Sequence, residues 1–491
     1  MSIITVLLAV PLIGALLIFA FNRMPYLARH IAAAATLLVL LGAAYITGMY
    51  NSSVADYQFA QVTEWFPAFG VSYAVGLDSL SLPLFVLTAV LGFLVVIYSW
   101  NITERAPFYF GLLLVLETGV LGVFSALDFF LFYIFWEVVL IPMFFLIGIW
   151  GGGRRSYASM KFLIYTHVAS LVMLLAIGAM FFKAGGILGH YTFMIPEITA
   201  AGFDVSFQML VFPALLLAFC VKLPVVPVHT WLPDAHVEAP TAASVLLAGV
   251  LLKMGGYGLI RIAYLINPQA AAAYTPLVVV LALISIIYGA YAAFTQDDLK
   301  KLIAYSSVSH MGFVLLGLAS ANYAGALGAV YQMVAHGVIS AVLFMACGVI
   351  QHNCGTRQIS RLGGLFPKMP LTMTLLALAF FASMGIPGFM GFFAEFSVML
   401  GVYQSFGLLV LAVALGAVLT VAYSLWAFQR VAFGKLPSDM ADVHDAQWYE
   451  VFPMAALLLI ALYLGLQPDA LIACMDGSVQ SMASAFGFMG R

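Results

Sequence analysis

The chain has 491 residues, of which 64% are hydrophobic and only 8% are charged, with a formal net charge of −2. Soluble globular domains carry about a quarter charged residues, so this composition excludes that class. The sequence contains no basic nucleic-acid-binding patch, no Walker loop and no Gly-x-Gly-x-x-Gly motif. Its four cysteines lack Cys-x-x-Cys spacing, which argues against a disulfide framework or a metal cluster. The composition predicts an all-α, polytopic membrane protein.

Apolar runs recur along the whole chain and are separated by polar residues, glycine and proline. Because a membrane-crossing helix needs about 20 mostly apolar residues, we predict fourteen spans, at 2–21, 28–50, 79–100, 107–125, 128–149, 158–182, 206–231, 241–263, 274–294, 300–319, 323–349, 371–402, 406–431 and 450–467. The first run has no basic residues before it, so we expect a membrane span there rather than a cleaved signal.

The distribution of basic residues predicts the orientation of these spans. With the N-terminus outside, the inside connections carry twelve Lys and Arg residues and the outside connections carry three. Because positive charge accumulates in cytoplasmic loops, we expect both termini outside, in the periplasm of a bacterial cell. A bacterial inner membrane is favoured over the mitochondrial inner membrane. The outside connection 51–78 contains Asp56, Glu64 and Asp78 and is expected to lie along the surface.

The predicted spans divide the chain into four parts. Residues 1–106 hold three spans, 107–263 and 274–431 are two blocks of five spans, and 432–491 hold the last span and a tail. Because five is odd, the second block starts on the opposite face of the membrane, as in the inverted repeats of many transporters. Each block contains one proline-interrupted span at a similar offset, and the sequence predicts broken helices at Lys222–Pro227 and Gly385–Gly388.

Four ionisable residues lie well inside apolar runs: Glu137, Lys222, Lys253 and Glu395. Each buried charge costs about 2.5–3.5 kcal/mol on insertion scales, so such residues normally face the bundle interior or a hydrated path. The affinity of a lysine for its proton changes when a carboxylate partner arrives or leaves. These residues are therefore candidates for proton transfer, and static ion pairs that fix helix packing are the alternative.

Histidines supply further candidates. His310 and His336 lie on consecutive spans among several serines, and they are either proton relays or hydrogen-bonded core residues. His229 and His236 belong to the segment HTWLPDAHVEAP, whose spacing matches no zinc signature. We expect that segment to be a proton-collecting funnel at the inside face or a structural turn.

Two further ionisable residues lie near spans and are secondary candidates. Glu117 follows the apolar start of the fourth span, and Lys161 lies close to the basic connection before the sixth. Lys161 is near enough to that connection for its long side chain to reach the interface. Neither is expected to carry the main proton path.

Four segments carry a resemblance to a known family. They are LDFFLFYIFWEVVLIPMFFLIGIWG, KLPVVPVHTWLPDAHVEAPTAASVLLAGVLLKMGGYGLIR, DDLKKLIAYSSVSHMG and GIPGFMGFFAEF. The chain resembles the antiporter-like membrane subunits of proton-pumping NADH:quinone oxidoreductase, respiratory complex I. Its similarity is to subunit M, or chain 4, because the resemblance implies a glutamate at Glu395, where sister subunits have lysine.

The resemblance implies roles for the intramembrane residues. Glu137 and Lys222 would form the coupling pair, and Lys253 would be the next proton carrier on a central axis. His336 would connect the two halves, and Glu395 would be the terminal carrier. His310, His229 and His236 are secondary.

The resemblance also implies partners and cofactors. L-type and N-type antiporter-like subunits would lie on either side, and the chain would contact lipid and protons but no nucleic acid. We expect no cofactor in this chain, which would be part of a translocase enzyme without holding its redox site. FMN, iron–sulfur clusters, NADH and a quinone such as ubiquinone would be bound by other subunits.

Four alternatives stay open. The chain could belong to a multisubunit cation/proton antiporter, or to a related F420H2- or hydrogenase-linked complex. A cytochrome-b-like electron carrier would need His167, His310 and His336 as haem ligands. A purely structural membrane subunit would use the buried charges for packing alone.

Overall fold

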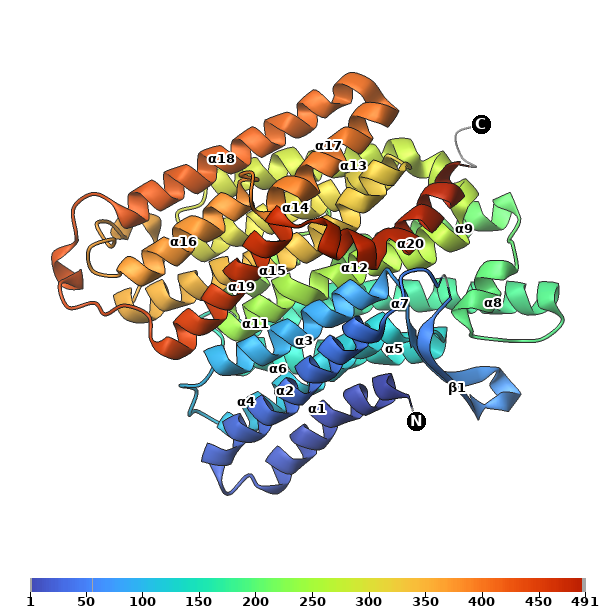
Figure 1. Ribbon diagram of the computed structural model, residues 1–491, viewed down its shortest axis with the longest axis horizontal. Coiled ribbons are helices and arrows are strands. Elements are labelled where there is room, and N and C mark those ends of the chain that lie inside the picture. Colours follow the sequence, from blue (N-terminus) through green and yellow to red (C-terminus); the bar gives the residue numbers. More distant parts are fainter. Residues whose placement is uncertain (1, 55, 488–491) are drawn as a thin grey trace.

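The computed structural model describes residues 2–54 and 56–487, and most of these residues form long helices lying side by side (Figure 1). Thirteen helical stretches in this part of the chain are long and apolar enough to cross a membrane. The stretch 390–432 contains two helices, α17 (Met390–Phe406) and α18 (Val410–Ala432). Counted separately they give the fourteen predicted spans, so the prediction of a polytopic helical protein is confirmed.

The remaining spans follow the predicted order. Those before the first break are α1 (Ile3–Ala20), α2 (Pro25–Met49), α3 (Ser81–Tyr98), α4 (Ala106–Ser125), α5 (Phe129–Val138) with α6 (Leu140–Trp150), α7 (Arg155–Leu188) and α9 (Val205–Lys222). Those after it are α11 (Thr241–Leu246) with α12 (Leu252–Gly258), α13 (Pro268–Phe294), α14 (Leu299–Ala319), α15 (Tyr323–Cys354), α16 (Pro370–Ser383) with α17, α18 and α19 (Trp448–Leu466).

Local sequence signals explain where several helices begin. Asp128, Asp204 and Asp298 precede α5, α9 and α14, and each carboxylate accepts hydrogen bonds from backbone N–H groups of the first turn. This capping satisfies donors that have no partner within the helix. Proline opens α2, α13 and α16, where its missing N–H removes no helical hydrogen bond.

Two spans are interrupted, as predicted. Helix α9 ends at Lys222, and the short helix α10 (Trp231–Glu238) follows after eight non-helical residues, 223–230. Helix α16 ends at Ser383, and α17 begins at Met390. Gly385 and Gly388 in the second break have φ angles of +69° and +100°, which L-residues with a side chain rarely adopt. Both predicted breaks are confirmed.

The most deeply buried spans lie in the middle of the bundle. The span 241–264 is buried throughout, and α14 and α15 are nearly so. Within 241–264 the helix widens into π-helical turns at 247–251 and 259–264, which flank α12. Single π-helical turns are often found at functional sites. These three buried spans carry Lys253, His310 and His336.

The connection 51–78 does not simply follow the surface as expected. It folds into an antiparallel hairpin of β1 (Gln58–Phe66) and β2 (Val71–Leu77). Strand β1 is mostly exposed, but β2 is largely buried against α4 and α5. Ala74 of β2 accepts a backbone hydrogen bond from Leu127, so the inner edge of the hairpin is paired.

Most of the C-terminal tail, for which the sequence analysis predicted no conformation, is helical. Helix α20 (Asp469–Gly487) packs against α3 and α15. It buries one apolar face, made of Leu471, Met475, Val479 and Met482, whose spacing is that of one side of a helix. We call the end of the bundle that carries β1, β2, α8 (Ile195–Ala200) and α20 the hairpin end (Figure 1, right). The relation of the two five-span blocks as inverted repeats stays a prediction.

Candidate functional site

Four of the predicted residues form a buried series across four spans, 241–264, α14, α15 and α16 with α17. The Lys253 Nζ donates a hydrogen bond to His336 Nδ1 over 2.7 Å. The His336 ring lies edge-on to the His310 ring, with 5.5 Å between ring centroids. His310 Nε2 lies 3.4 Å from Glu395 Oε1. All four residues are at most 5% exposed, so the series runs through the interior of the protein.

The π-helical turns position Lys253 at the start of this series. Its Nζ also donates to the carbonyl oxygen of Ala248, in the widened turn before it. Gly255, two residues after Lys253, allows the helix to approach the first break closely. A Cβ on Gly255 would lie only 2.7 Å from the backbone nitrogen of Leu223. The buried ammonium is therefore held by one carbonyl and one imidazole, and no carboxylate bonds to it among the described residues.

A small polar cavity joins the two histidines to Glu395. Its lining includes His310, His336 and Glu395, together with Ser306, Gln332 and Ser340. The centre of a water molecule can occupy about 10 Å³ within this cavity. This is room for about one water. His336 Nε2, Gln332 Oε1 and Ser340 Oγ have no hydrogen-bond partner in the described protein. These three atoms are suited to holding that water.

The second broken helix positions the end of the series. Glu395 lies on α17, one turn after the break, and a Cβ at Gly385 would come within 3.1 Å of Glu395 Oε2. The carboxylate therefore lies against the unwound backbone of the break. This arrangement agrees with the requirement that non-helical backbone at membrane depth be covered by protein or reached by water.

Lys222 lies at the last residue of α9, where the first break begins. It is 2% exposed, and its Nζ has no hydrogen-bond partner within the described residues. The ammonium lies over two aromatic rings, 5.5 Å from the centroid of Trp136 and 5.8 Å from that of Phe162. Cation–π attraction of this kind compensates only part of the cost of burying a charge. No direct hydrogen bond joins Lys222 to Lys253.

Glu137 does not form the direct ion pair with Lys222 that the term coupling pair suggests. It lies next to the irregular turn between α5 and α6, and its Oε2 is 3.0 Å from Nδ1 of His167 on α7. Both side chains are partly exposed on the bundle surface, Glu137 at 24% and His167 at 47%. The structural reason is that Trp136, the residue before Glu137, fills the space beside the Lys222 ammonium. The functional role of the pair stays a prediction.

The remaining sequence candidates lie outside the series. His229, in the first break, packs its ring against Tyr288 at 5.3 Å, and His236 on α10 stacks on Phe344 at 4.4 Å. Lys161 forms a 2.7 Å ion pair with Asp234 rather than extending freely to the interface. The funnel role of the HTWLPDAHVEAP segment stays a prediction.

Glu117 is a buried carboxyl that lies apart from the residues described so far. It is buried in α4, packs against Gly92 of α3, and neither carboxyl oxygen has a hydrogen-bond partner among the described residues. Among the described residues, no hydrogen bond, ion pair or shared cavity joins Glu117 to the series of Lys253, His336, His310 and Glu395. It therefore offers a buried carboxyl that is separate from the candidate path.

The sequence analysis did not single out Lys300 as a buried residue. Lys300 begins α14 and was counted with the basic connections, but it is buried, and its Nζ donates to the Ala239 carbonyl. It lines a polar cavity of about 520 Å³ at the end of the bundle opposite the hairpin end, together with Glu238, Arg357 and Glu450. A partial sequence signal was available, since Lys300 and Lys301 are neighbours in the first turn of the helix capped by Asp298, and neighbouring helical residues point in different directions.

Comparison with known proteins identifies the family of this site. The chain belongs to the NADH:quinone oxidoreductase/Mrp antiporter transmembrane family, whose family model matches residues 126–420. It is 41% identical over 501 residues to F(420)H(2) dehydrogenase subunit M of Methanosarcina mazei, covering 100% of both chains. It is 39% identical over 470 residues to NADH-quinone oxidoreductase subunit M of Rhodobacter capsulatus, covering 94% of this chain and 91% of the relative.

Solved structures agree with this assignment. A chain of respiratory complex I from Thermus thermophilus superimposes with a TM-score of 0.88 at 31% identity, over 97% of this chain and 100% of that one. A chain of the Mrp complex from Dietzia sp. superimposes with a TM-score of 0.87 at 22% identity, over 99% and 98% of the two chains. The second match shows a shared fold alone. The predicted family is thus confirmed.

Proposed function

We propose that this chain transfers protons across a membrane as the M-type subunit of a proton-pumping NADH:quinone oxidoreductase. The observation that carries the proposal is the buried series Lys253, His336, His310 and Glu395, linked by contacts of 2.7 to 3.4 Å and by one ring contact. Titratable groups at such spacing, with room for a water beside them, can pass a proton from one to the next. A purely structural subunit has no need of two adjacent histidines between a lysine and a glutamate.

The first step of the proposed mechanism concerns Lys222. Its ammonium lies over aromatic rings, and among the described residues no carboxylate bonds to it. A change in the charge of Glu137, the residue after Trp136, would therefore change how tightly Lys222 holds its proton. Glu137 and His167 lie at the bundle surface, where a neighbouring subunit would touch them. A movement of that neighbour would change the charge of the Glu137–His167 pair, and Lys222 would then release its proton toward Lys253 through water.

The later steps follow the series. Lys253 passes its proton to His336, to which it is already hydrogen bonded, and the proton continues through His310 to Glu395. Glu395 would release it beside the second break, where the backbone is unwound. We propose that L-type and N-type subunits flank the chain, and that other subunits bind NADH, FMN, iron–sulfur clusters and the quinone.

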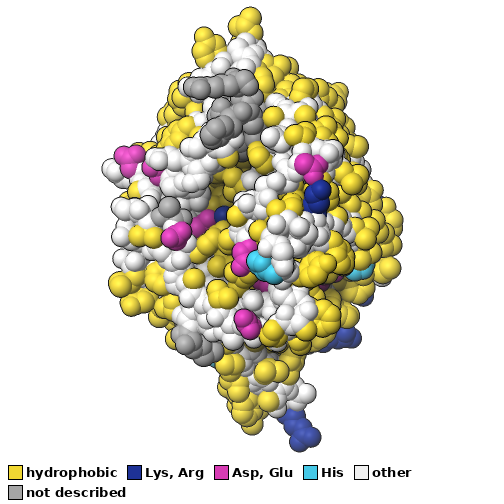
Figure 2. All heavy atoms as spheres, turned by 90° about the vertical axis from the view of Figure 1, so that its right-hand side faces the viewer, with side chains coloured by type: hydrophobic (Ala, Val, Ile, Leu, Met, Phe, Trp, Pro, Cys, Tyr) yellow, Lys and Arg dark blue, Asp and Glu magenta, His cyan; other side chains and the backbone are white. Residues whose placement is uncertain are grey.

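We propose a bacterial inner membrane as the location, with the hairpin end in the periplasm. Figure 2 shows this end with acidic side chains scattered over it, and most Lys and Arg residues lie in connections at the opposite end. That asymmetry is expected if the opposite end faces the cytoplasm. A cysteine introduced at Thr63 in β1 should react with an impermeant maleimide from the periplasmic side only.

The function is tested with Lys222→Ala and Glu137→Ala in the assembled complex, reconstituted in sealed vesicles. We expect fewer protons pumped per electron, because the loading step is lost. Glu117→Gln is the matched control, since it neutralises a buried carboxyl outside the series and should leave the ratio unchanged. A normal ratio in both alanine variants, with full assembly, would remove the loading role.

The electron donor has a second candidate. The 41% identity to F(420)H(2) dehydrogenase subunit M extends over the full length of both chains, so a complex that oxidises F420H2 fits the similarity as well. The proton path proposed for this chain would be the same in either complex. The subunits that purify with the chain decide between them, and sodium flux without any electron donor would instead favour a cation/proton antiporter.

A further inference from the structure

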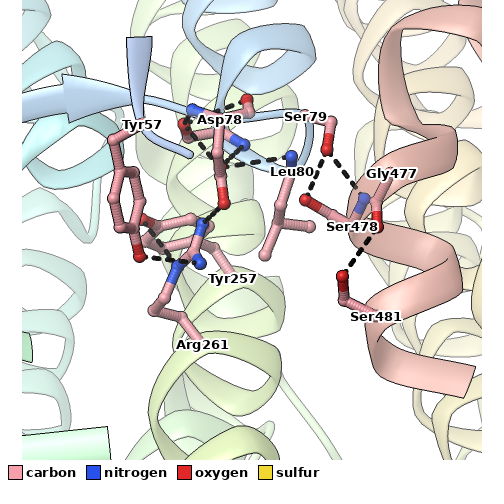
Figure 3. Close-up of polar contacts among 10 residues, drawn as sticks. Tyr57, Asp78, Ser79, Leu80, Tyr257, Arg261, Gly477, Ser478 and Ser481 are labelled. Carbon is pink, nitrogen blue, oxygen red and sulfur yellow. Dashed lines mark hydrogen bonds and ion pairs between the residues drawn. The ribbon is translucent and has the colours of Figure 1, made fainter. Parts of the chain in front are cut away.

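A buried ion pair at the hairpin end is not used by the mechanism above. Arg261 donates from Nη2 to Oδ2 of Asp78, and both residues are about 8% exposed. Figure 3 shows the guanidinium also pointing at two phenol oxygens, Tyr57 at 3.2 Å and Tyr257 at 3.4 Å. The other oxygen of Asp78 accepts hydrogen bonds from Leu80 N and Ser81 N at the start of α3. The arginine is therefore held in place from several directions.

Arg261 lies on the same helical span as Lys253. Lys253, Tyr257 and Arg261 are four residues apart, a spacing that places side chains on one face of a helix. This face leads from the start of the proton series directly toward the hairpin end. Tyr257 is buried between the two cations, and its hydroxyl accepts from the Arg261 Nε.

The face that carries Lys253 and Tyr257 ends at Arg261, which lines a cavity at the hairpin end. A cavity of about 160 Å³ at the hairpin end is lined by Asp78, Arg261, Ser79 and Ser478, which is room for several waters at about 30 Å³ each. In the proposed function, a proton that escaped from Lys253 along this face would reach the periplasm without passing Glu395. Equally, a periplasmic proton could run backward to Lys253.

Arg261 lines the cavity at the end of this helix face, so a proton that moves between the cavity and Lys253 would have to pass it. A guanidinium cannot give up its proton in a protein, so it cannot act as a link in a proton relay. Its fixed positive charge also repels a proton, as fixed cations do in pores that exclude protons. Asp78 holds the guanidinium at the cavity, and Ser79 and Ser478 close the far wall through their mutual hydrogen bonds.

We propose that Arg261, positioned by Asp78, seals the hairpin end of the Lys253 helix against protons. The inference rests on the proposed function, because it assigns Lys253 a proton that must be kept from leaking. Arg261 is a positioning and barrier residue and transfers no proton itself. The seal directs protons from Lys253 to His336. It also closes the first half of the chain to protons on the periplasmic side.

The expected size of the effect follows from the helix geometry. Eight residues span about 12 Å along an α-helix. Two unit charges at that distance, in a medium of effective dielectric constant about 20, change an equilibrium about tenfold. Removal of the arginine charge should therefore speed passive proton flux by about tenfold or more, since the relay block is lifted at the same time.

The test is passive proton flux through the assembled complex in sealed vesicles, under an imposed pH gradient and without electron donor. Arg261→Met removes the charge, and Arg261→Lys keeps a cation at the same place. We expect a leak in the first and tight vesicles in the second. An equal leak in both, or none in Arg261→Met with full assembly, would overturn the seal.

Two further variants make the outcome decisive. Asp78→Asn removes the carboxylate that positions the arginine but keeps the arginine charge, so the seal predicts a leak smaller than that of Arg261→Met, whereas a purely structural clasp predicts equal leaks in the two variants. Lys253→Met added to Arg261→Met should abolish the leak, and a persisting leak would mean that protons bypass Lys253. If Arg261→Met does not assemble, Arg261→Gln replaces it. Loss of NADH-driven pumping in Lys253→Met alone tests the proposed function separately.

Discussion

At the scale of single residues, Lys222 is a side chain whose burial costs stability and whose proposed role is functional. Its ammonium is buried over Trp136 and Phe162, and none of the residues that the structure describes forms a hydrogen bond with it. Replacing buried charges by apolar groups of similar volume often leaves stability unchanged or raises it by about 1–4 kcal/mol. Lys222 is therefore kept at a cost in stability, which is typical of functional residues within a membrane.

We predict that Lys222→Met stabilises the complex while abolishing proton loading. Methionine fills a similar volume and removes the desolvation cost, so the free energy of unfolding should rise by about 1–3 kcal/mol. The melting temperature of the detergent-solubilised complex and the proton-to-electron ratio in vesicles are both measured. Lys161→Met is the control, because it leaves the partner Asp234 unpaired and should not stabilise. A lower melting temperature for Lys222→Met would contradict the prediction.

Glu395→Gln isolates the final proton-transfer step. Glutamine keeps the shape of the side chain and its contact with His310, but it cannot bind and release a proton. Pumping should fall at least several-fold, while electron transfer to artificial acceptors stays close to normal. The same two assays on Glu117→Gln give the reference for loss of a buried carboxyl alone. Unchanged pumping in Glu395→Gln would exclude this residue from the path.

At the scale of elements, the second broken helix holds Glu395 through one glycine. Gly385 has a φ of +69°, and a Cβ there would contact the carboxylate, whereas Gly388 has a φ of +100° and open space where its Cβ would be. Both substitutions by alanine strain the backbone by about 1–3 kcal/mol. Only the one at Gly385 also displaces Glu395.

Gly385→Ala and Gly388→Ala therefore form a matched pair. We expect both to lower the melting temperature by a similar amount, and only Gly385→Ala to lower the proton-to-electron ratio as well. Thermal unfolding and pumping are compared in the same preparations. Equal pumping in the two variants would show that the break does not position the carboxylate.

At the scale of the whole molecule, the hairpin, α3, the Lys253 span and α20 meet at Asp78, Ser79, Arg261 and Ser478, which we call the outer clasp. Burial alone would raise the pKa of Asp78, but the Arg261 guanidinium and the hydrogen bonds from Ser81 outweigh it and hold the pKa below its usual value. Besides Ser81, the groups facing this carboxylate are the backbone N–H of Leu80, Arg261 and, beyond the arginine, Tyr57 and Tyr257.

The pKa of Asp78 sets an acid limit for the outer clasp. Because its pKa is lower in the folded than in the unfolded chain, the ionised carboxylate stabilises the fold above about pH 4, and this contribution is lost as the pH falls through the folded value. Backbone hydrogen exchange in β2 and α20 should be slow between pH 5 and 8 once corrected for intrinsic rates. We expect faster corrected exchange once the pH falls below the folded-state pKa of Asp78, and Asp78→Asn should show the fast exchange already at pH 7.

The spans, the two breaks and the intramembrane ionisable residues could all be predicted from the order of residues along the chain. These are local properties, since the length of an apolar run, the missing N–H of proline and a charge within a run act on their own segment. The hairpin and α20 were not predicted, because their apolar faces are short, alternate with polar residues and are buried only where the bundle packs against them.

Only the tertiary structure decided which of these residues meet. Lys253 reaches His336 across 83 positions, Arg261 reaches Asp78 across 183, and Glu137 faces His167 instead of contacting Lys222. The spacing of residues along a helix fixes which side chains share a face. The neighbour of that face depends on how helices distant in the chain pack together, and a single sequence does not contain that pairing in any local pattern.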